Sequence, residues 1–143
     1  MKKKMWATTA VCLIVLGSLS LIAAAPVAEK SKMERGRYLV EGLGLCGECH
    51  TPTNEKGDPL PGKAFSGAPV LMKPIVPMPA WAEKAPNIAG LPGWTDADAV
   101  KFLMTGIGYN GLSPRPPMPP YRMSKEDAEV VVMYLKSLAP AGK

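Results

Sequence analysis

Apolar residues recur with the spacing of one helix face in three stretches of the chain, and each stretch opens with a similar pair of side chains. A serine or threonine is followed three positions later by an acidic residue, an arrangement that caps the first turn of a helix. The helices are expected to begin near Ser31, Thr95 and Ser124. Their apolar faces are Met33, Gly36, Leu39, Val40 and Leu43, then Val100, Leu103, Met104 and Ile107, then Val130, Val131, Tyr134, Leu135 and Leu138. The expected stop signals are Gly42 and Gly44, then Gly106, then Pro140.

The stretch between the first and second helices is rich in proline and has no helical pattern. It holds nine prolines from Pro52 to Pro92. No run of β-branched residues resembles a buried strand, so the chain is predicted to be all-α. Residues 70–81 are expected to form an extended surface insertion. An irregular loop of this length is unusual in a compact domain, which suggests that it wraps around something other than protein.

The N-terminal part has the pattern of an export or membrane segment. Three lysines at positions 2–4 precede twenty uncharged residues, Trp6 to Ala25. A secretory signal has an apolar region of about 7–15 residues, whereas about 20 residues are enough to span a bilayer. Residues 1–28 are therefore expected to be a signal peptide or a retained membrane anchor, and residues 29–143 the folded domain. Both interpretations place the domain on the periplasmic side, because the basic end stays in the cytoplasm. Cys12 is interpreted as a small apolar residue of this segment.

The charge of the chain excludes a nucleic-acid-binding function. The formal net charge is +5, and three of the 17 basic residues are the lysines at positions 2–4. Pro26 and the residues after it therefore carry 14 basic and 12 acidic side chains. Such a balance gives no strongly basic face.

The chemistry of the chain is concentrated in Cys46-Gly47-Glu48-Cys49-His50. Two cysteines three apart, with a histidine directly after the second, form the attachment sequence of a c-type haem. Each thiol can form a thioether to one vinyl group, and the histidine, the only one in the chain, becomes the proximal iron ligand. A thioredoxin-like dithiol would need a βαβ context, and a structural zinc site would need further ligands. A disulfide between the cysteines would leave His50 unexplained.

Several segments make residues 31–139 similar to class I cytochrome c. The segments Glu34 to Val40, His50-Thr51-Pro52, Pro86-Asn87-Ile88, Gly93 to Asp96 and Met118 to Tyr121 resemble those of bacterial cytochromes that work beside membrane dehydrogenases. The resemblance implies a cytochrome c fold of three main helices, with the long proline-rich loop wrapping one covalent haem. It also implies that the first and last helices cross at right angles, with Gly36 allowing close approach and Tyr134 packing on the crossing.

A methionine is the expected sixth ligand of the iron. Met118 lies just before the last helix, as the ligand does in the family, and prolines on both sides limit its backbone freedom. Met78 is the second candidate and Met72 a further one. The other candidate contacts are less specific. Trp94, Tyr109, Tyr121 and Arg115 are candidates for hydrogen bonds to the propionates, Asn87 and the Pro86 carbonyl for orienting His50 or the propionates, and Pro59, Pro61 and Pro69 for lining the haem edge.

These features predict an electron carrier rather than an enzyme. Ligation by His50 and Met118 would fill both axial positions of one covalent haem c and leave no position for a substrate. The expected partners are a dehydrogenase, another cytochrome or a terminal oxidase on the periplasmic side, with the domain soluble after cleavage or tethered by residues 6–25. Two alternatives remain: a haem enzyme or gas sensor with a displaceable distal ligand, and a cytochrome subunit of a membrane oxidoreductase complex.

Overall fold

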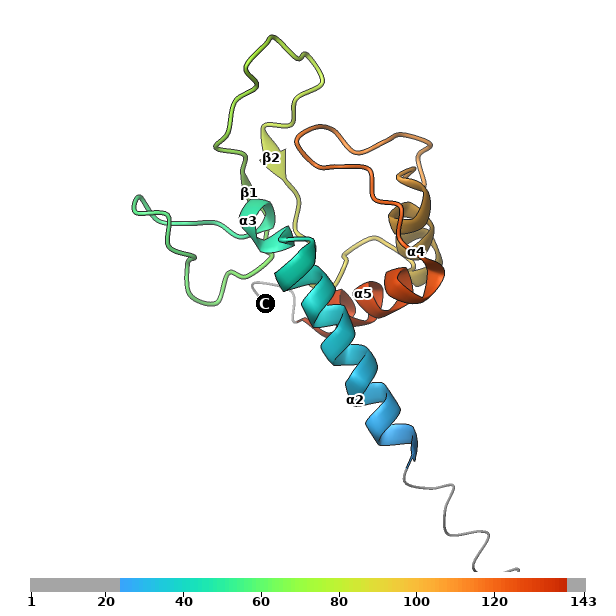
Figure 1. Ribbon diagram of the computed structural model, residues 1–143. Helices are drawn as coiled ribbons and strands as arrows, with labels where there is room; N and C mark the ends of the chain where they lie inside the picture. The colour runs from blue at the N-terminus through green and yellow to red at the C-terminus, as the bar shows by residue number, and fades with distance from the viewer. Residues whose placement is uncertain (1–23, 139–143) are drawn as a thin grey trace, which may run out of the picture. The chain divides into compact units, whose positions relative to one another are not determined.

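The computed structural model describes residues 24–138 of the chain (Figure 1). The chain divides into two compact units, Met1–Lys32 and Met33–Lys143, and the boundary falls inside helix α2. Most of the expected leader, with its lysines and Cys12, lies outside the described residues, as does Pro140. Between residues 24 and 138, no helix is both long enough and apolar enough to cross a membrane.

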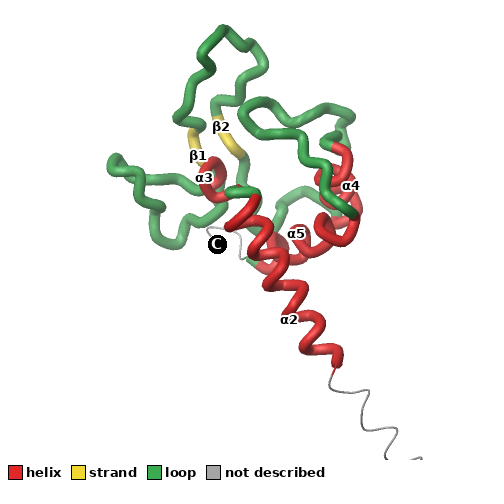
Figure 2. Tube along the Cα trace, viewed as in Figure 1, coloured by secondary structure: helices red, strands yellow, loops and turns green. Residues whose placement is uncertain are grey.

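The described part is mainly helical, with long irregular connections (Figure 2). Its elements in chain order are helix α2 (Ala24–Arg37), the π-helical turn η1 (Tyr38–Leu43), helix α3 (Cys46–His50), strands β1 (Ala68–Pro69) and β2 (Lys84–Ala85), and helices α4 (Asp96–Thr105) and α5 (Lys125–Ser137). The helical character agrees with the predicted fold class.

The predicted starts of the second and third helices are confirmed. The Thr95 hydroxyl accepts a hydrogen bond from the Asp98 amide at 3.1 Å, and the Ser124 hydroxyl accepts one from the Asp127 amide at 3.2 Å. Each bond satisfies an amide that has no partner within the helix. Helix α4 stops at Gly106, whose φ of 68° is easily adopted by glycine. These two helices were therefore predictable from local chemistry alone.

The predicted start of the first helix is wrong. Helix α2 begins at Ala24, so Ser31 lies inside it and caps nothing. The residues ahead of Ser31 include several good helix formers, and Pro26 falls in the first turn. A proline is tolerated there because the backbone amides of the first turn have no partner within the helix.

The π-helical turn η1 also changes which residues face the core. The Gly44 amide donates to the Leu39 carbonyl at 2.7 Å, five residues back rather than the usual four. This wider turn rotates the following residues away from the expected face. Leu39 and Val40 are buried as predicted, whereas Leu43 is 65% exposed, contrary to the prediction.

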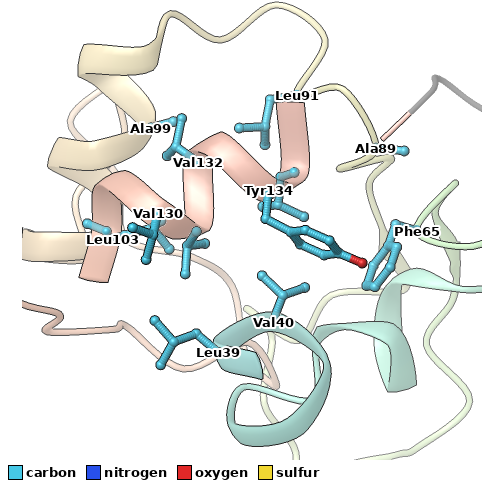
Figure 3. Packing of buried hydrophobic residues seen from close by; sticks show 13 residues of the cluster. Leu39, Val40, Phe65, Ala89, Leu91, Ala99, Leu103, Val130, Val132 and Tyr134 are labelled. Carbon is cyan, nitrogen blue, oxygen red and sulfur yellow. The ribbon is translucent and has the colours of Figure 1, made fainter. Parts of the chain in front are cut away.

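The core lies where η1, α4 and α5 meet. Figure 3 shows Leu39 and Val40 facing Tyr134 and Val130 of α5, with Leu103 of α4 on the other side of that helix. Gly36 makes the predicted close approach. A Cβ atom built there would lie 2.9 Å from both Tyr134 Cβ and the Val130 carbonyl carbon.

The proline-rich stretch contains a small antiparallel sheet that the all-α prediction missed. β1 and β2 pair with Ala68 opposite Ala85 and Pro69 opposite Lys84. This ladder closes the base of residues 70–81, which we call the insertion. The insertion is on the surface, as predicted, with Leu71, Ile75 and Val76 largely exposed. Strands of two residues carry too little periodic pattern to be recognised in a sequence.

The pKa of Tyr134 predicts that the fold loses stability at alkaline pH. Burial, and then hydrogen bonding to the Glu41 carboxylate, raises the pKa of Tyr134 to about 12. An unfolded tyrosine loses its proton near pH 10, so between about pH 10 and 12 the folded state holds the proton more tightly. The contribution of Tyr134 to the free energy of unfolding should therefore fall as pH rises through this range.

We expect Tyr134→Phe to show a smaller loss of stability than the wild type over that range, measured by urea unfolding followed by circular dichroism. Tyr38→Phe is the matched control, because Tyr38 is 56% exposed and phenylalanine keeps its ring beside Arg35. It should retain the wild-type pH dependence. Equal pH dependence in all three proteins would contradict the assignment.

Candidate haem-binding site

Helix α3 carries both cysteines and the histidine of the attachment sequence. Leu45 enters it with a left-handed backbone (φ 48°), and the helix runs from Cys46 to His50. Positions three apart lie on the same side of a helix, so one face presents both sulfur atoms. Cys46 and Cys49 are half-buried free thiols, whereas His50 is only 6% exposed. Among residues 24–138, no group of three or more Cys, His, Asp or Glu side chains is placed to hold a metal ion.

The ring of His50 has a defined orientation. Its Nδ1 atom lies 2.7 Å from the Pro86 carbonyl oxygen, which can only accept a hydrogen bond. Nδ1 therefore carries the proton, and the lone pair of Nε2 is available to a metal. Burial lowers the pKa of His50, and the Pro86 carbonyl opposes this effect. A neutral imidazole with Nδ1 fixed in this way is the form that binds haem iron, so the donor set fits a haem.

The structure selects one of the two candidates for orienting His50. The contact comes from the Pro86 carbonyl, whereas the Asn87 side chain accepts a hydrogen bond from the Ala89 amide at 2.9 Å. Asn87 thus shapes the turn that presents Pro86. The sequence suggested both residues because they are adjacent in the chain. Only the path of the backbone in the structure shows which of the two contacts His50.

Contacts that the sequence did not reveal hold the C-terminal end of α3. The Thr51 hydroxyl accepts a hydrogen bond from the Phe65 amide at 3.0 Å, and the His50 carbonyl accepts one from the Gly67 amide at 2.8 Å. The Phe65 ring also lies near Gly47, with ring carbons 3.6 and 3.9 Å from the position that a Cβ would take. Phe65 had no motif or periodic pattern around it that could have revealed this role.

Tyr121 connects the region before α5 to the start of α3. Its hydroxyl donates to the Gly44 carbonyl at 3.1 Å and lies beside the Cys46 thiol. Burial raises the pKa of the Cys46 thiol, and hydrogen bonding with Tyr121 partly opposes this. Burial also raises the pKa of Tyr121. Tyr121, suggested above as a propionate contact, is therefore engaged with the attachment helix.

Met118 lies in a turn between α4 and α5. Its side chain is half-buried, and its amide donates to the Arg115 carbonyl at 3.2 Å. The other two candidate ligands are on the insertion and are more exposed, Met78 by 40% and Met72 by 52%. Arg115, another candidate propionate contact, uses its Nε and Nη2 atoms to bind carbonyls of the insertion instead.

The chain is similar to known cytochromes. No family model matches it. A "diheme cytochrome c-type" protein of Cereibacter sphaeroides is 37% identical over 100 residues, which are 66% of this chain and 31% of that protein. The gluconate 2-dehydrogenase cytochrome c subunit of Pantoea cypripedii is 34% identical over 128 residues, 81% of this chain and 28% of that subunit. The fructose dehydrogenase cytochrome subunit of Gluconobacter japonicus is 32% identical over 114 residues, 73% of this chain and 21% of that subunit.

The helical fold, the attachment helix and these similarities together indicate a protein of the cytochrome c class. More particularly, the chain resembles bacterial cytochromes c associated with dehydrogenases, as its sequence predicted. The chain spans less than a third of the length of these curated relatives. The relatives are cytochromes or cytochrome subunits of dehydrogenases, which supports an electron-transfer role and a haem c cofactor.

Proposed function

We propose that this chain is an electron-transfer protein that carries one electron at a time on a single covalent haem c. Cys46 and Cys49 would form the two thioethers, and His50 and Met118 the axial ligands. The observation that carries the proposal is the contact between His50 Nδ1 and the Pro86 carbonyl, which leaves Nε2 free to bind iron. The similarity to cytochrome subunits of dehydrogenases supports the same conclusion.

The residues of the site have distinct tasks in this function. The haem supplies the one-electron chemistry when it is bound. The short helix α3 carries the two thiols and the imidazole on neighbouring positions, and the hydrogen bond to Pro86 holds the ring in a single tautomer. Met118 would hold the iron through its thioether, which would raise the reduction potential. The chain would then transfer electrons without binding a substrate at the iron.

Replacement of Met118 tests this assignment. We expect Met118→Ala to lose the charge-transfer band that marks a thioether on ferric haem iron, and to become high-spin and bind carbon monoxide rapidly. The reduction potential should fall by on the order of a tenth of a volt, a modest part of the roughly 0.8 V range that axial ligands span. Absorption spectroscopy and redox titration measure these changes.

Met78→Ala is the matched control, because Met78 is also flanked by two prolines but lies on the exposed insertion. It should keep the band and the wild-type potential. Loss of the band in Met78→Ala alone would make Met78 the ligand. A wild type that is high-spin when oxidised, and binds carbon monoxide rapidly when reduced, would instead favour a haem enzyme or gas sensor.

The names of the relatives favour one more specific role, that of a cytochrome subunit in a dehydrogenase complex. We propose a dehydrogenase as the electron donor, with another cytochrome or a terminal oxidase as the acceptor, on the periplasmic side of the membrane. Residues 1–28 would export the domain or anchor it. The intact mass of the mature protein tests two of these proposals. It reports whether one haem is attached to the chain, and whether residues 1–28 are retained.

A further inference from the structure

The insertion (residues 70–81) is connected directly to the turn that holds Met118. We call residues 113–120 the methionine segment. Arg115 donates from Nε to the Ala80 carbonyl at 3.0 Å and from Nη2 to the Trp81 carbonyl at 2.6 Å. The Ala82 amide, at the end of the insertion, donates to the Pro116 carbonyl at 2.7 Å. Figure 1 shows the two segments side by side, the insertion above β1 and β2 and the methionine segment in orange.

These three hydrogen bonds join the methionine segment to a part of the chain that is distant in sequence. The Met118 amide bonds only to Arg115, within the segment itself. After the segment, Tyr121 bonds to Gly44 and Met123 to Leu103, whereas Leu112, just before it, accepts only a local bond from the Gly108 amide. Within the described part of the chain, the hydrogen bonds that join residues 113–120 to a distant segment go to the insertion or to Ala82 next to it. The Pro120 carbonyl also accepts a bond from the nearby Arg122 side chain, at 3.3 Å.

The insertion is itself constrained, so it can serve as a support. Its base is closed by the β1–β2 ladder and by a bond of 2.9 Å from the Val70 amide to the Glu83 carbonyl. The indole of Trp81 donates across it to the Met72 carbonyl at 3.1 Å. Prolines in both segments limit their backbone freedom (Pro74, Pro77 and Pro79, and Pro114, Pro116, Pro117, Pro119 and Pro120). Little conformational entropy is lost when two such segments are joined.

We propose that the insertion braces the methionine segment, and that Arg115 is the positioning residue that joins them. The guanidinium is suited to this task because two of its N–H groups point along one edge and can bind two consecutive carbonyls. The ammonium of a lysine cannot reproduce that fork. The part of the proposal that concerns iron rests on the proposed ligation by Met118. A loosened segment would release the weak thioether ligand more often.

The test compares two ways of removing the brace in the haem-loaded protein. Arg115→Ala removes two of the three bonds. In the second variant, an Asn-Gly pair replaces residues 71–82. Val70 and Glu83 are already hydrogen-bonded neighbours, and Asn-Gly is suited to a two-residue hairpin turn. Lys73→Ala is the matched control, because it removes one positive charge from the insertion without affecting these bonds.

The first readout is backbone hydrogen exchange at positions 112, 113, 115 and 118, the non-proline positions of residues 112–120, and it does not depend on the identity of the iron ligand. Exchange should be on the order of tenfold faster in Arg115→Ala, at least as fast in the hairpin variant, and unchanged in Lys73→Ala. The second readout is the thioether charge-transfer band, which should disappear at a lower temperature in both variants. Arg115→Lys should fall between Arg115→Ala and the wild type.

The possible outcomes distinguish a failure of the brace from a failure of the proposed iron ligation by Met118. Wild-type exchange rates in both variants would overturn the brace, whatever the spectra show. Faster exchange with an unchanged thermal loss of the band would overturn the positioning role of Arg115. A wild type without the band would refute ligation by Met118, and the exchange rates would still decide whether the insertion holds the segment.

Discussion

The double variant Cys46→Ala/Cys49→Ala is expected to lose covalent haem completely. Each cysteine supplies one of the two thioethers, and no other covalent link between chain and haem is expected. His50 alone would hold the haem through one coordinate bond, which denaturing extraction breaks. The intact mass after acidified-solvent extraction should therefore equal that of the bare polypeptide, whereas the wild type should retain the mass of one haem.

The third cysteine of the chain provides the control for this experiment. Cys12 lies in the apolar N-terminal run, and Cys12→Ala should retain one haem per chain. Each single variant, Cys46→Ala or Cys49→Ala, should yield less holoprotein, attached through one thioether. A double variant that still carries the haem mass would contradict attachment through these two cysteines. A wild type that carries no haem would favour the dithiol or disulfide interpretation.

Local chemistry explains which parts of this structure could be predicted from the sequence. The caps at Thr95 and Ser124 depend on residues three positions apart, so the pattern that predicts them also forms them. The spacing of Cys46, Cys49 and His50 is also local, and it produces a single helix face. Gly36 was predictable for a different reason. The resemblance to class I cytochrome c implied that the first and last helices approach each other closely at this glycine.

The remaining features depend on contacts between distant backbone groups. Pro86 lies 36 residues from His50, and its carbonyl is chemically the same as that of any other proline in the stretch. Arg115 binds carbonyls 34 and 35 residues away, and nothing in the sequence marks Ala80 or Trp81 as acceptors. The exposed Leu43 shows a related limit, because a pattern with a period of 3.6 residues fails where a single wide turn changes the register. The helical fold class, two of the helix starts and the Pro86 carbonyl as one candidate contact of His50 were therefore predictable, whereas the contacts of Phe65 and Arg115 were not.

The close approach at Gly36 leads to the second large prediction, that Gly36→Ala destabilises the fold. In most helix positions alanine would be better than glycine by about 1 kcal/mol. Here the added methyl group would lie 2.9 Å from Tyr134 Cβ and from the Val130 carbonyl carbon. The second of these is backbone, which cannot rotate away, so α2 and α5 must separate. Overpacking of this kind typically costs about 1–3 kcal/mol. Because the helix preference of alanine offsets about 1 kcal/mol of this cost, we expect a net loss of up to about 2 kcal/mol in the free energy of unfolding.

Urea unfolding measures this loss, and Gly42→Ala isolates its cause. Gly42 is exposed, and a Cβ there would meet only the ring of Tyr38, at 3.2 and 3.3 Å. That ring is 56% exposed and can move aside, so the helix preference of alanine should dominate and stability should be unchanged or slightly higher. Equal stability of Gly36→Ala and Gly42→Ala would mean that the helices do not approach as closely as the structure shows. Both variants replace a glycine by alanine. A loss of stability in Gly36→Ala alone, with an unchanged slope of the free energy of unfolding against urea concentration, would therefore be due to the contact between α2 and α5.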